Sequence, residues 1–163
     1  MPLLSPADNE SGVKGSPAHV RTEFELTVHA PYSVAFPLFG PDGERSWAGP
    51  DWNPRFVHPN PAADIQGTVF TVKHVANEAV WVNTVFDFEG RRIQYAYFIS
   101  DVMVTTINLT FLPLDSVSTK VSVIYERTAL NVVANETVQQ FGAADRARGA
   151  DWEKAINSCL QKQ

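Results

Sequence analysis

The residues of this sequence best suited to acid–base or metal chemistry are its four histidines, at positions 19, 29, 58 and 74. They have neither the H-x-x-x-H spacing of a helical zinc site nor a nearby pair of cysteines, so we expect no metal and no cofactor. His74 shares the strand parity of Phe70 and Val72, which would place its imidazole inside the protein, for proton transfer or for a structural hydrogen bond. His58 is either a base at a pocket mouth or an ordinary loop residue.

Nucleophilic catalysis has no clear carrier in the sequence. The single cysteine, Cys159, is expected near the C-terminus of a helix, where the helix dipole disfavours a thiolate. The sequence has no G-x-S-x-G motif, and the segment GPDGE at Gly40–Glu44 has the wrong spacing for a phosphate-binding loop. We therefore assign no catalytic residue, and nucleotide hydrolysis is disfavoured.

Tyrosines and one arginine are the polar groups that suggest a binding site. Alternation along the chain places Tyr95 and Tyr97 on one face of a strand at 92–99, and Tyr125 and Arg127 on one face of a strand at 119–129. Buried hydroxyl and guanidinium groups need hydrogen-bond partners that an apolar core cannot supply. A ligand or ordered water could supply them, so these residues favour an internal cavity.

Composition sets the broad class of the protein. The chain has 163 residues, 44% of them hydrophobic, and a formal net charge of −5. We expect a disordered arm at 1–18 and one domain at 19–163 with a sizeable core. The acidic balance disfavours nucleic acid, and no apolar run approaches the ~20 residues that span a bilayer. The first residues lack the features of a secretory signal, so we expect a cytoplasmic protein.

Hydrophobic periodicity predicts an α+β domain. A short helical segment after Pro31, shortened by Pro37, precedes a connection at 40–67 that is rich in turn residues and aromatic rings. The expected sheet is antiparallel, has six to seven strands, and curves around one long C-terminal helix at 135–160. The periodic runs that define its strands are 19–28, 68–74, 80–88, 92–99, 102–112 and 119–129.

Small residues occupy the middle of the expected C-terminal helix, while its large apolar residues lie at the two ends. Glycine inside a helix costs about 1 kcal/mol relative to alanine. Gly142 and Gly149 therefore need a compensating reason, which is either close packing on a strand or room for a ligand. The sequence leaves both interpretations open.

The order of elements and several local strings resemble the START-related SRPBCC superfamily, and within it a bacterial, polyketide cyclase-like subgroup of small proteins. The resemblance implies a helix-grip fold with a deep, mostly hydrophobic cavity between sheet and helix, and an aromatic loop near its mouth. The strings that carry it are LFGPDGERSWAGPDWNPRFVHP (Leu38–Pro59), GTVFTVKH (Gly67–His74), WVNTVFDFEGRRIQYAYF (Trp81–Phe98) and ADWEKAINSCL (Ala150–Leu160).

These observations lead to one functional hypothesis and two alternatives. The first is binding of a small hydrophobic or aromatic molecule in the cavity, with a homodimer left open. The second is a cyclase or dehydratase in which His74, a tyrosine or Arg127 assists proton movement. The third is a subunit that docks to another protein through the loop Trp47–Phe56. The residues expected to bind ligand are Trp47, Trp52, Phe56, Phe70, Val72, His74, Trp81, Tyr95, Tyr97, Ile107, Tyr125, Arg127 and Phe141.

Overall fold

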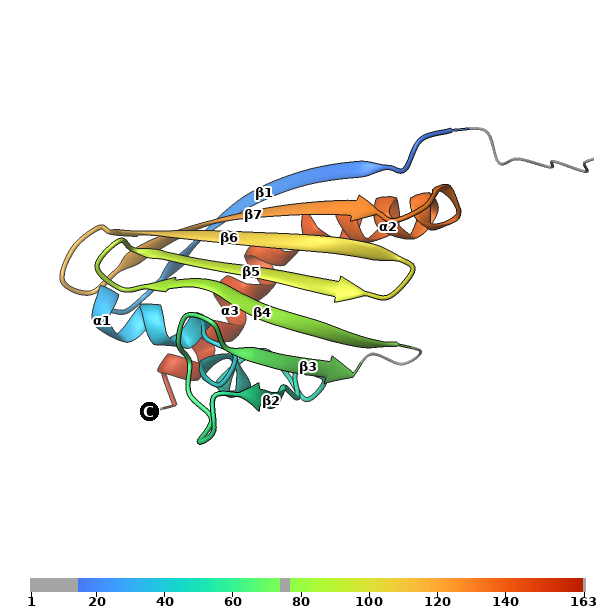
Figure 1. Ribbon diagram of the computed structural model, residues 1–163. Coiled ribbons are helices and arrows are strands. Elements are labelled where there is room, and N and C mark those ends of the chain that lie inside the picture. Colours follow the sequence, from blue (N-terminus) through green and yellow to red (C-terminus); the bar gives the residue numbers. More distant parts are fainter. Residues whose placement is uncertain (1–14, 74–76, 163) are drawn as a thin grey trace, which may run out of the picture.

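A computed structural model describes residues 15–73 and 77–162 of the chain (Figure 1). Within these residues, one sheet contains seven strands, all paired antiparallel. The strands are β1 (His19–Val28), β2 (Arg55–His58), β3 (Val69–Lys73), β4 (Glu78–Asp87), β5 (Arg92–Ile99), β6 (Met103–Pro113) and β7 (Thr119–Ala129).

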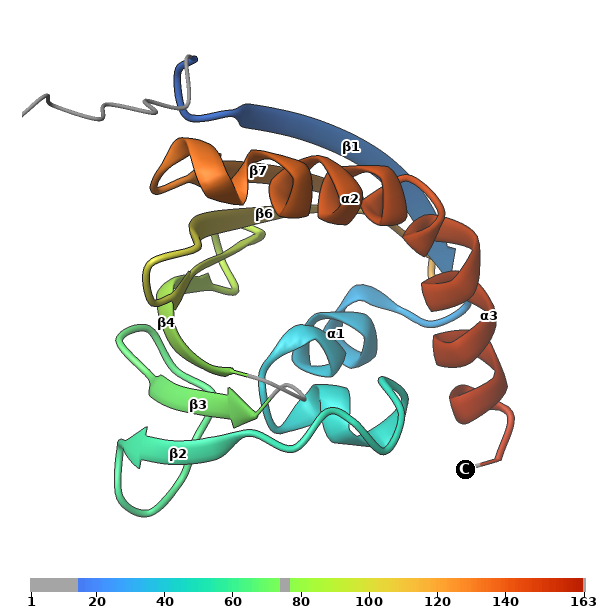
Figure 2. The same cartoon turned by 90° about the vertical axis from the view of Figure 1, so that its right-hand side faces the viewer.

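Helical segments lie at two places in the chain order. Short ones follow β1, and longer ones follow β7 and cross the concave side of the sheet (Figure 2). The short segments are α1 (Tyr32–Ala35), η1 (Phe36–Phe39) and η2 (Gly43–Ser46). The later segments are η3 (Val132–Ala134), α2 (Asn135–Asp145) and α3 (Arg148–Leu160). This arrangement confirms the predicted α+β class and the helix-grip architecture.

The sheet order is β1-β7-β6-β5-β4-β3-β2, so the first strand pairs with the last. The five strands from β3 to β7 form the meander that short turns predicted. Edge strand β2 was not predicted as a strand. It has only four residues and lies between Pro54 and Pro59, so it is too short to show an alternating pattern. It pairs with β3, where Phe56 lies opposite Phe70.

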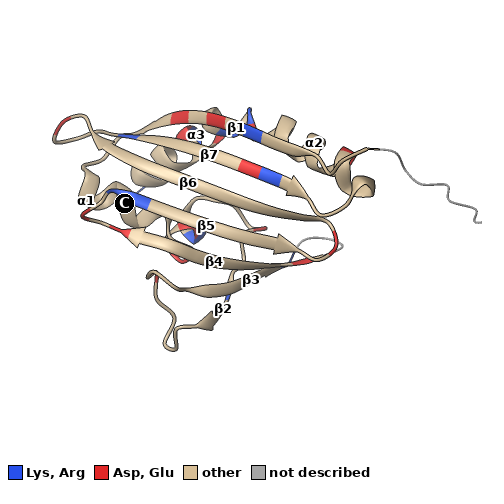
Figure 3. Ribbon diagram, turned by 45° about the horizontal axis from the view of Figure 1, so that its top comes forward, with Lys and Arg blue, Asp and Glu red and all other residues tan. Residues whose placement is uncertain are grey.

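The predicted inward faces of the strands are confirmed by burial. Along β5, β6 and β7, alternate residues are buried and point to the helix side of the sheet. The outer faces of β1 and β7 carry charges of both signs (Figure 3), including an ion pair of 2.8 Å between Glu25 and Lys120. The buried residues of these inner faces, which include the predicted Tyr95, Tyr97, Tyr125 and Arg127, are Ile93, Tyr95, Tyr97, Ile99, Thr105, Ile107, Leu109, Phe111, Val121, Val123, Tyr125 and Arg127.

The C-terminal helix, predicted as one rod over 135–160, is divided into two segments at Arg146 and Ala147. Figure 2 shows that α3 changes direction relative to α2 and follows the curve of the sheet. The division coincides with Asp145, whose side chain is fully buried and accepts hydrogen bonds from two arginines. An amphipathic pattern alone did not reveal this buried polar contact.

The two helical glycines have a packing role. A Cβ atom on Gly142 would lie 2.4 Å from Cγ1 of Val20, and one on Gly149 would lie 3.1 Å from Cδ2 of Phe24. Both neighbours belong to β1, so the glycines allow α2 and α3 to lie directly on that strand. Of the two interpretations open from the sequence, close packing is the one that the structure supports.

Part of the sequence lies outside the described residues. This part contains residues 1–14 of the predicted arm and also His74, so both expectations stay predictions. Residues 16 and 18 are held by Asn135, whose side chain accepts from the Ala18 amide at 2.7 Å and donates to the Ser16 carbonyl at 3.0 Å. Among the described residues, no helix is long and apolar enough to cross a bilayer.

Candidate functional site

A cavity of about 340 Å³ lies between the concave face of the sheet, the loop that contains η2, and the helices α2 and α3. This volume lies within the range of roughly 300–1,000 Å³ that is usual for small-molecule sites. The sheet forms the floor, and the loop and α3 form the solvent side. Many predicted residues line it, namely Trp47, Trp52, Val72, Trp81, Tyr95, Tyr97, Ile107, Tyr125, Arg127 and Phe141.

Two of the predicted residues lie behind the wall instead of on it. Phe70 is fully buried, and its ring stacks with Trp81 at a centroid distance of 5.7 Å. The Phe56 ring packs on the other side of Phe70, at 6.1 Å. Both therefore support the Trp52 and Trp81 side of the cavity without lining it. The alternation along a strand predicts which side chains point inward, but it does not predict whether an inward side chain lines the cavity or lies behind its wall.

Several residues that line the cavity were not among those expected to bind ligand. Ile99 and Leu109 share the parity of predicted neighbours, so that signal was present in the sequence. The lining residues Arg148, Trp152 and Ala155 of α3 follow the predicted Phe141 at helical spacing, so that signal was also present in the sequence. The lining residues that were missed are Glu44, Ala48, Asp51, Ile99, Leu109, Arg148, Asp151, Trp152 and Ala155.

Arg127 is the most buried charged group of the wall, and the protein itself supplies its partners. Its guanidinium donates to the Asp145 carboxylate through Nε at 2.6 Å and through Nη2 at 2.8 Å. Nη1 donates to the hydroxyl of Tyr97 and to Oγ1 of Thr105, the latter at 3.1 Å. Burial disfavours the charge of Arg127, but the hydrogen bonds and charge interactions with Asp145 and Tyr97 together outweigh it and raise the pKa of the guanidinium. Arg127 therefore needs no ligand as a counter-charge.

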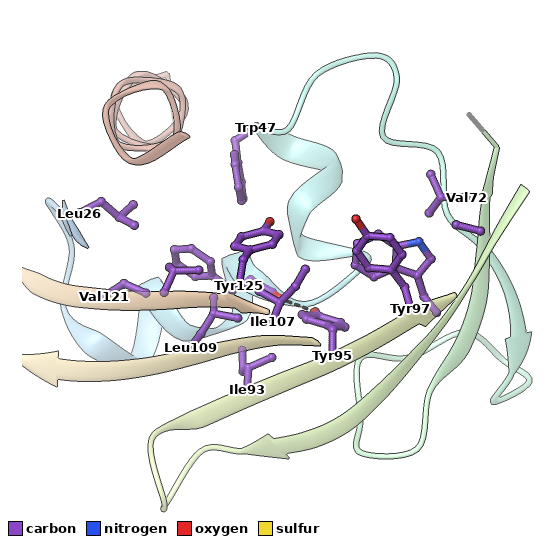
Figure 4. Packing of buried hydrophobic residues seen from close by; sticks show 14 of the residues in the cluster. Leu26, Trp47, Val72, Ile93, Tyr95, Tyr97, Ile107, Leu109, Val121 and Tyr125 are labelled. Carbon is purple, nitrogen blue, oxygen red and sulfur yellow. Dashed lines mark hydrogen bonds between the residues drawn. The ribbon is translucent and has the colours of Figure 1, made fainter. Parts of the chain in front are cut away.

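The three tyrosines of the wall differ in what their hydroxyls do. Tyr95 donates to the carbonyl of Phe39 at 2.5 Å, and Tyr97 accepts from Arg127. The hydroxyl of Tyr125 forms no hydrogen bond with any described residue, although the side chain is only 5% exposed. Figure 4 shows this hydroxyl directed away from the sheet toward Trp47. Burial raises the pKa of Tyr125, so the hydroxyl stays protonated and can donate to a ligand.

Indole rings dominate the wall, and all four tryptophans of the chain line the cavity. Trp47 and Trp152 meet edge to face at a centroid distance of 5.4 Å, and Trp52 and Trp81 do so at 5.5 Å. Trp47 donates to the carbonyl of Leu38 at 2.7 Å and Trp52 donates to that of Pro41 at 2.9 Å. These bonds hold both rings of the loop inward. Trp81 stacks on Tyr97 at 4.0 Å, and its buried Nε1 has no partner among the described residues.

Glu44 of η2 is the carboxyl group of the wall with the most altered titration. Burial raises the pKa of its side chain well above the ordinary range, and the nearby Asp64 carboxylate adds to the effect. Asp64 accepts from the amides of Asp42 and Gly43 at 2.9 and 3.1 Å, and so fixes the start of the loop. The cavity thus contains a carboxyl group that favours its protonated form. The described residues contain no cluster of three or more potential metal ligands.

Comparison of the sequence with known families and proteins finds no matching family model and no matching curated protein. Structural similarity is extensive. Norcoclaurine synthase from Thalictrum flavum is 14% identical, with a TM-score of 0.65 over 91% of this chain and 99% of that chain. The aromatase/cyclase ZhuI from Streptomyces sp. R1128 is 14% identical, with a TM-score of 0.62 over 89% and 93%. Ara h 8.0201 is 16% identical, with a TM-score of 0.62 over 90% and 100%.

These likenesses cover nearly the whole of each chain, but sequence identities this low carry information on fold and not on activity. The shared features are the curved antiparallel sheet and the C-terminal helix that lies across it. The chain therefore shares with these proteins the helix-grip fold that the sequence resemblance predicted.

Proposed function

We propose that the protein binds a small, largely apolar or aromatic molecule inside the cavity. The observation that carries the proposal is the hydroxyl of Tyr125, a side chain only 5% exposed, which has no hydrogen-bond partner among the described residues and lines a partly open cavity together with four indoles. A buried donor of this kind is costly unless something bonds to it. A ligand with one hydrogen-bond acceptor and an aromatic body would satisfy both the hydroxyl and the rings.

Energetics set what such a ligand needs. Burial of apolar surface contributes about 25 cal/mol per Å², so a ligand that hides ~200 Å² gains roughly 5 kcal/mol before the cost of association. Tight binding therefore needs a polar anchor as well. Two proteins of similar fold support a role for such a cavity: the norcoclaurine synthase was solved in complex with dopamine and hydroxybenzaldehyde, and ZhuI is an aromatase/cyclase.

Calorimetric titration with the neutral probe 1-naphthylmethanol tests the proposal. Ala155 lines the cavity from α3, so Ala155→Phe should fill part of it, whereas the neighbouring Lys154 is exposed. We expect the probe to bind the natural protein and the matched control Lys154→Phe with similar affinity, and to bind Ala155→Phe at least about tenfold more weakly. Equal binding to all three proteins would place the probe elsewhere and refute the proposal.

Glu44 favours a second candidate function, proton-transfer chemistry in the same cavity. A carboxyl group whose pKa is raised well above its ordinary value by burial is suited to act as a general acid. In an intramolecular aldol addition, one carbon loses a proton as the new C–C bond forms, and the carbonyl oxygen gains one. Water then leaves in the dehydration. Glu44 could supply the proton that reaches the oxygen.

Incubation with a synthetic linear polyketone distinguishes this activity from binding alone. Cyclised and dehydrated product should form with the natural protein and with Glu89→Gln, whose site lies in an exposed turn outside the cavity, and should fall at least about tenfold with Glu44→Gln. Equal product with Glu44→Gln would remove Glu44 from the chemistry. No product above the uncatalysed level with any protein would leave binding as the function.

The docking alternative receives no support from the loop Trp47–Phe56. The indoles of Trp47 and Trp52 face the cavity, and Trp47 is only 8% exposed. The apolar surface that the sequence offered to a protein partner is therefore turned inward.

A further inference from the structure

Charged groups on the cavity wall are unevenly paired. Arg127 and Arg148 both bind the same carboxylate, Asp145, with N–O distances between 2.6 and 2.9 Å. Three other carboxyl groups on the wall form no ion pair or hydrogen bond with any described residue; they are Glu44, Asp51 and Asp151. Asp145 thus serves two guanidinium groups, whereas Asp51 and Asp151 have no ion-pair partner among the described residues.

The unpaired carboxyl groups lie toward solvent, while the unpaired donor lies deeper. Asp51 and Asp151 are exposed and Glu44 is partly exposed, whereas Tyr125 is 5% exposed and has no hydrogen-bond partner among the described residues. The hydroxyl of Tyr125 is an observation independent of the acids, and it indicates an occupant with a polar atom inside the cavity.

Aromatic faces accompany the same carboxyl groups. Trp47 and Trp52 come from the loop that carries Glu44 and Asp51, and Trp152 follows Asp151 directly in α3. The face of an indole attracts a cation, and the attraction grows when water is excluded. Carboxylates and indoles both stabilise a positive charge, so both kinds of residue at the mouth of the cavity favour a cationic group on the ligand.

We infer that the ligand carries a protonated amine on an apolar body, with the ammonium group between Asp51 and Asp151 and the body beside Tyr125. This inference rests on the binding function proposed above and names the class of ligand for that site. A ligand of the same size with a carboxylate in place of the amine is disfavoured at this mouth, because its negative charge would be repelled by the unpaired carboxylates of the wall.

Arg148 is the competing anchor, because its guanidinium also lines the cavity and would attract an anion. Its Nε donates to Asp145 at 2.9 Å, and its side chain is 36% exposed. The attraction of Arg148 for an acid is therefore opposed by Asp145 at hydrogen-bond distance and by solvent. Within the described part of the chain, Asp51 and Asp151 have no ion-pair partner that would oppose their attraction for a cation. The wall therefore attracts an amine more strongly than it attracts an acid.

A matched series of probes tests the inference. The probes 1-naphthylmethylamine, 1-naphthylmethanol and 1-naphthoic acid share one ring system and differ in charge at neutral pH. Quenching of the four cavity tryptophans gives each affinity. We expect the amine to bind about tenfold more tightly than the alcohol, and the acid to bind most weakly. The preference for the amine should shrink in high salt.

Single substitutions test which carboxylates cause the preference for the amine probe. Asp151→Asn and Asp51→Asn should each weaken the amine about threefold to fivefold and leave the alcohol unchanged, and Glu89→Gln, in the exposed turn after β4, should affect neither. Equal binding of amine and alcohol, or tightest binding of the acid, would overturn the amine inference while the binding function stands. Failure of all three probes to bind would overturn both.

Discussion

Asp145 at the end of α2 and Arg127 in β7 form a buried ion pair with two hydrogen bonds, of 2.6 and 2.8 Å. The pair ties the C-terminal helices to β7, the neighbour of edge strand β1, at the point where α2 ends. Asp145 also accepts from Arg148 at 2.9 Å, which fixes the first turn of α3. Since α3 carries Asp151 and Trp152, this pair determines where one side of the cavity mouth lies.

Removal of one side chain of the Arg127–Asp145 pair should therefore lower the stability of the fold. Asp145→Leu leaves the Arg127 guanidinium buried without its counter-charge, and we expect a loss of about 3–5 kcal/mol in the free energy of unfolding, measured by urea denaturation. The double variant Arg127→Met with Asp145→Leu should recover most of that loss, because no charge is then buried. A loss below ~1 kcal/mol in the single variant would contradict the buried-pair account.

Tyr125 and Tyr95 should respond in opposite ways to loss of the hydroxyl. Tyr125→Phe breaks no hydrogen bond among the described residues, so stability should stay within about 0.5 kcal/mol, while affinity for 1-naphthylmethanol should fall about fivefold. Tyr95→Phe leaves the carbonyl of Phe39 unpaired and should cost about 1–2 kcal/mol of stability. Thermal unfolding and calorimetry on both variants check this, and a matching pattern in the two variants would contradict it.

The strands and their inward faces could be predicted because alternation of period two is a local signal. The site was only partly predictable, since it depends on contacts between distant residues. Nothing near Arg127 in the sequence indicates that Asp145 neutralises it, so its guanidinium was assigned to a ligand. The division of the predicted long helix after Asp145 depends on that same contact, so it could not be predicted either.

Gly142 should resist replacement even by alanine, although alanine favours a helix by about 1 kcal/mol. The new Cβ would lie 2.4 Å from Cγ1 of Val20, whose branched side chain has little freedom to move. We expect Gly142→Ala to lose about 1–3 kcal/mol of stability by chemical denaturation. In a Val20→Ala background, the same substitution should become neutral or stabilising. An equal loss in both backgrounds would show that the contact with Val20 is not the cause.

Glu44 should make the fold less stable as pH rises. Its pKa is raised in the folded state by burial, so the stability that its protonated form contributes is present below the ordinary value of 4.5 and is lost as pH rises through the higher folded value. Glu44→Gln carries no charge at any pH. Calorimetric scans should therefore show equal melting temperatures for the two proteins near about pH 4 and a higher one for the variant near about pH 8.

Asp115 provides a control of opposite sign. Its pKa is lowered by hydrogen bonds from the Val117 amide and the Ser118 hydroxyl, so its contribution to stability is present above the ordinary pKa and lost as pH falls. Asp115→Asn should melt lower than the natural protein near neutral pH and match it in acid. The account of Glu44 fails if Glu44→Gln shows the same offset in melting temperature at both pH values.

Intermolecular nuclear Overhauser effects with 1-naphthylmethanol test most directly whether the interior accepts a small molecule. The account predicts contacts from the naphthyl protons to Ile107, Leu109 and Tyr125, which line the cavity. Contacts confined to exposed apolar residues such as Val57 and Val133, which are 66% and 79% exposed, would show adventitious surface binding and contradict the account.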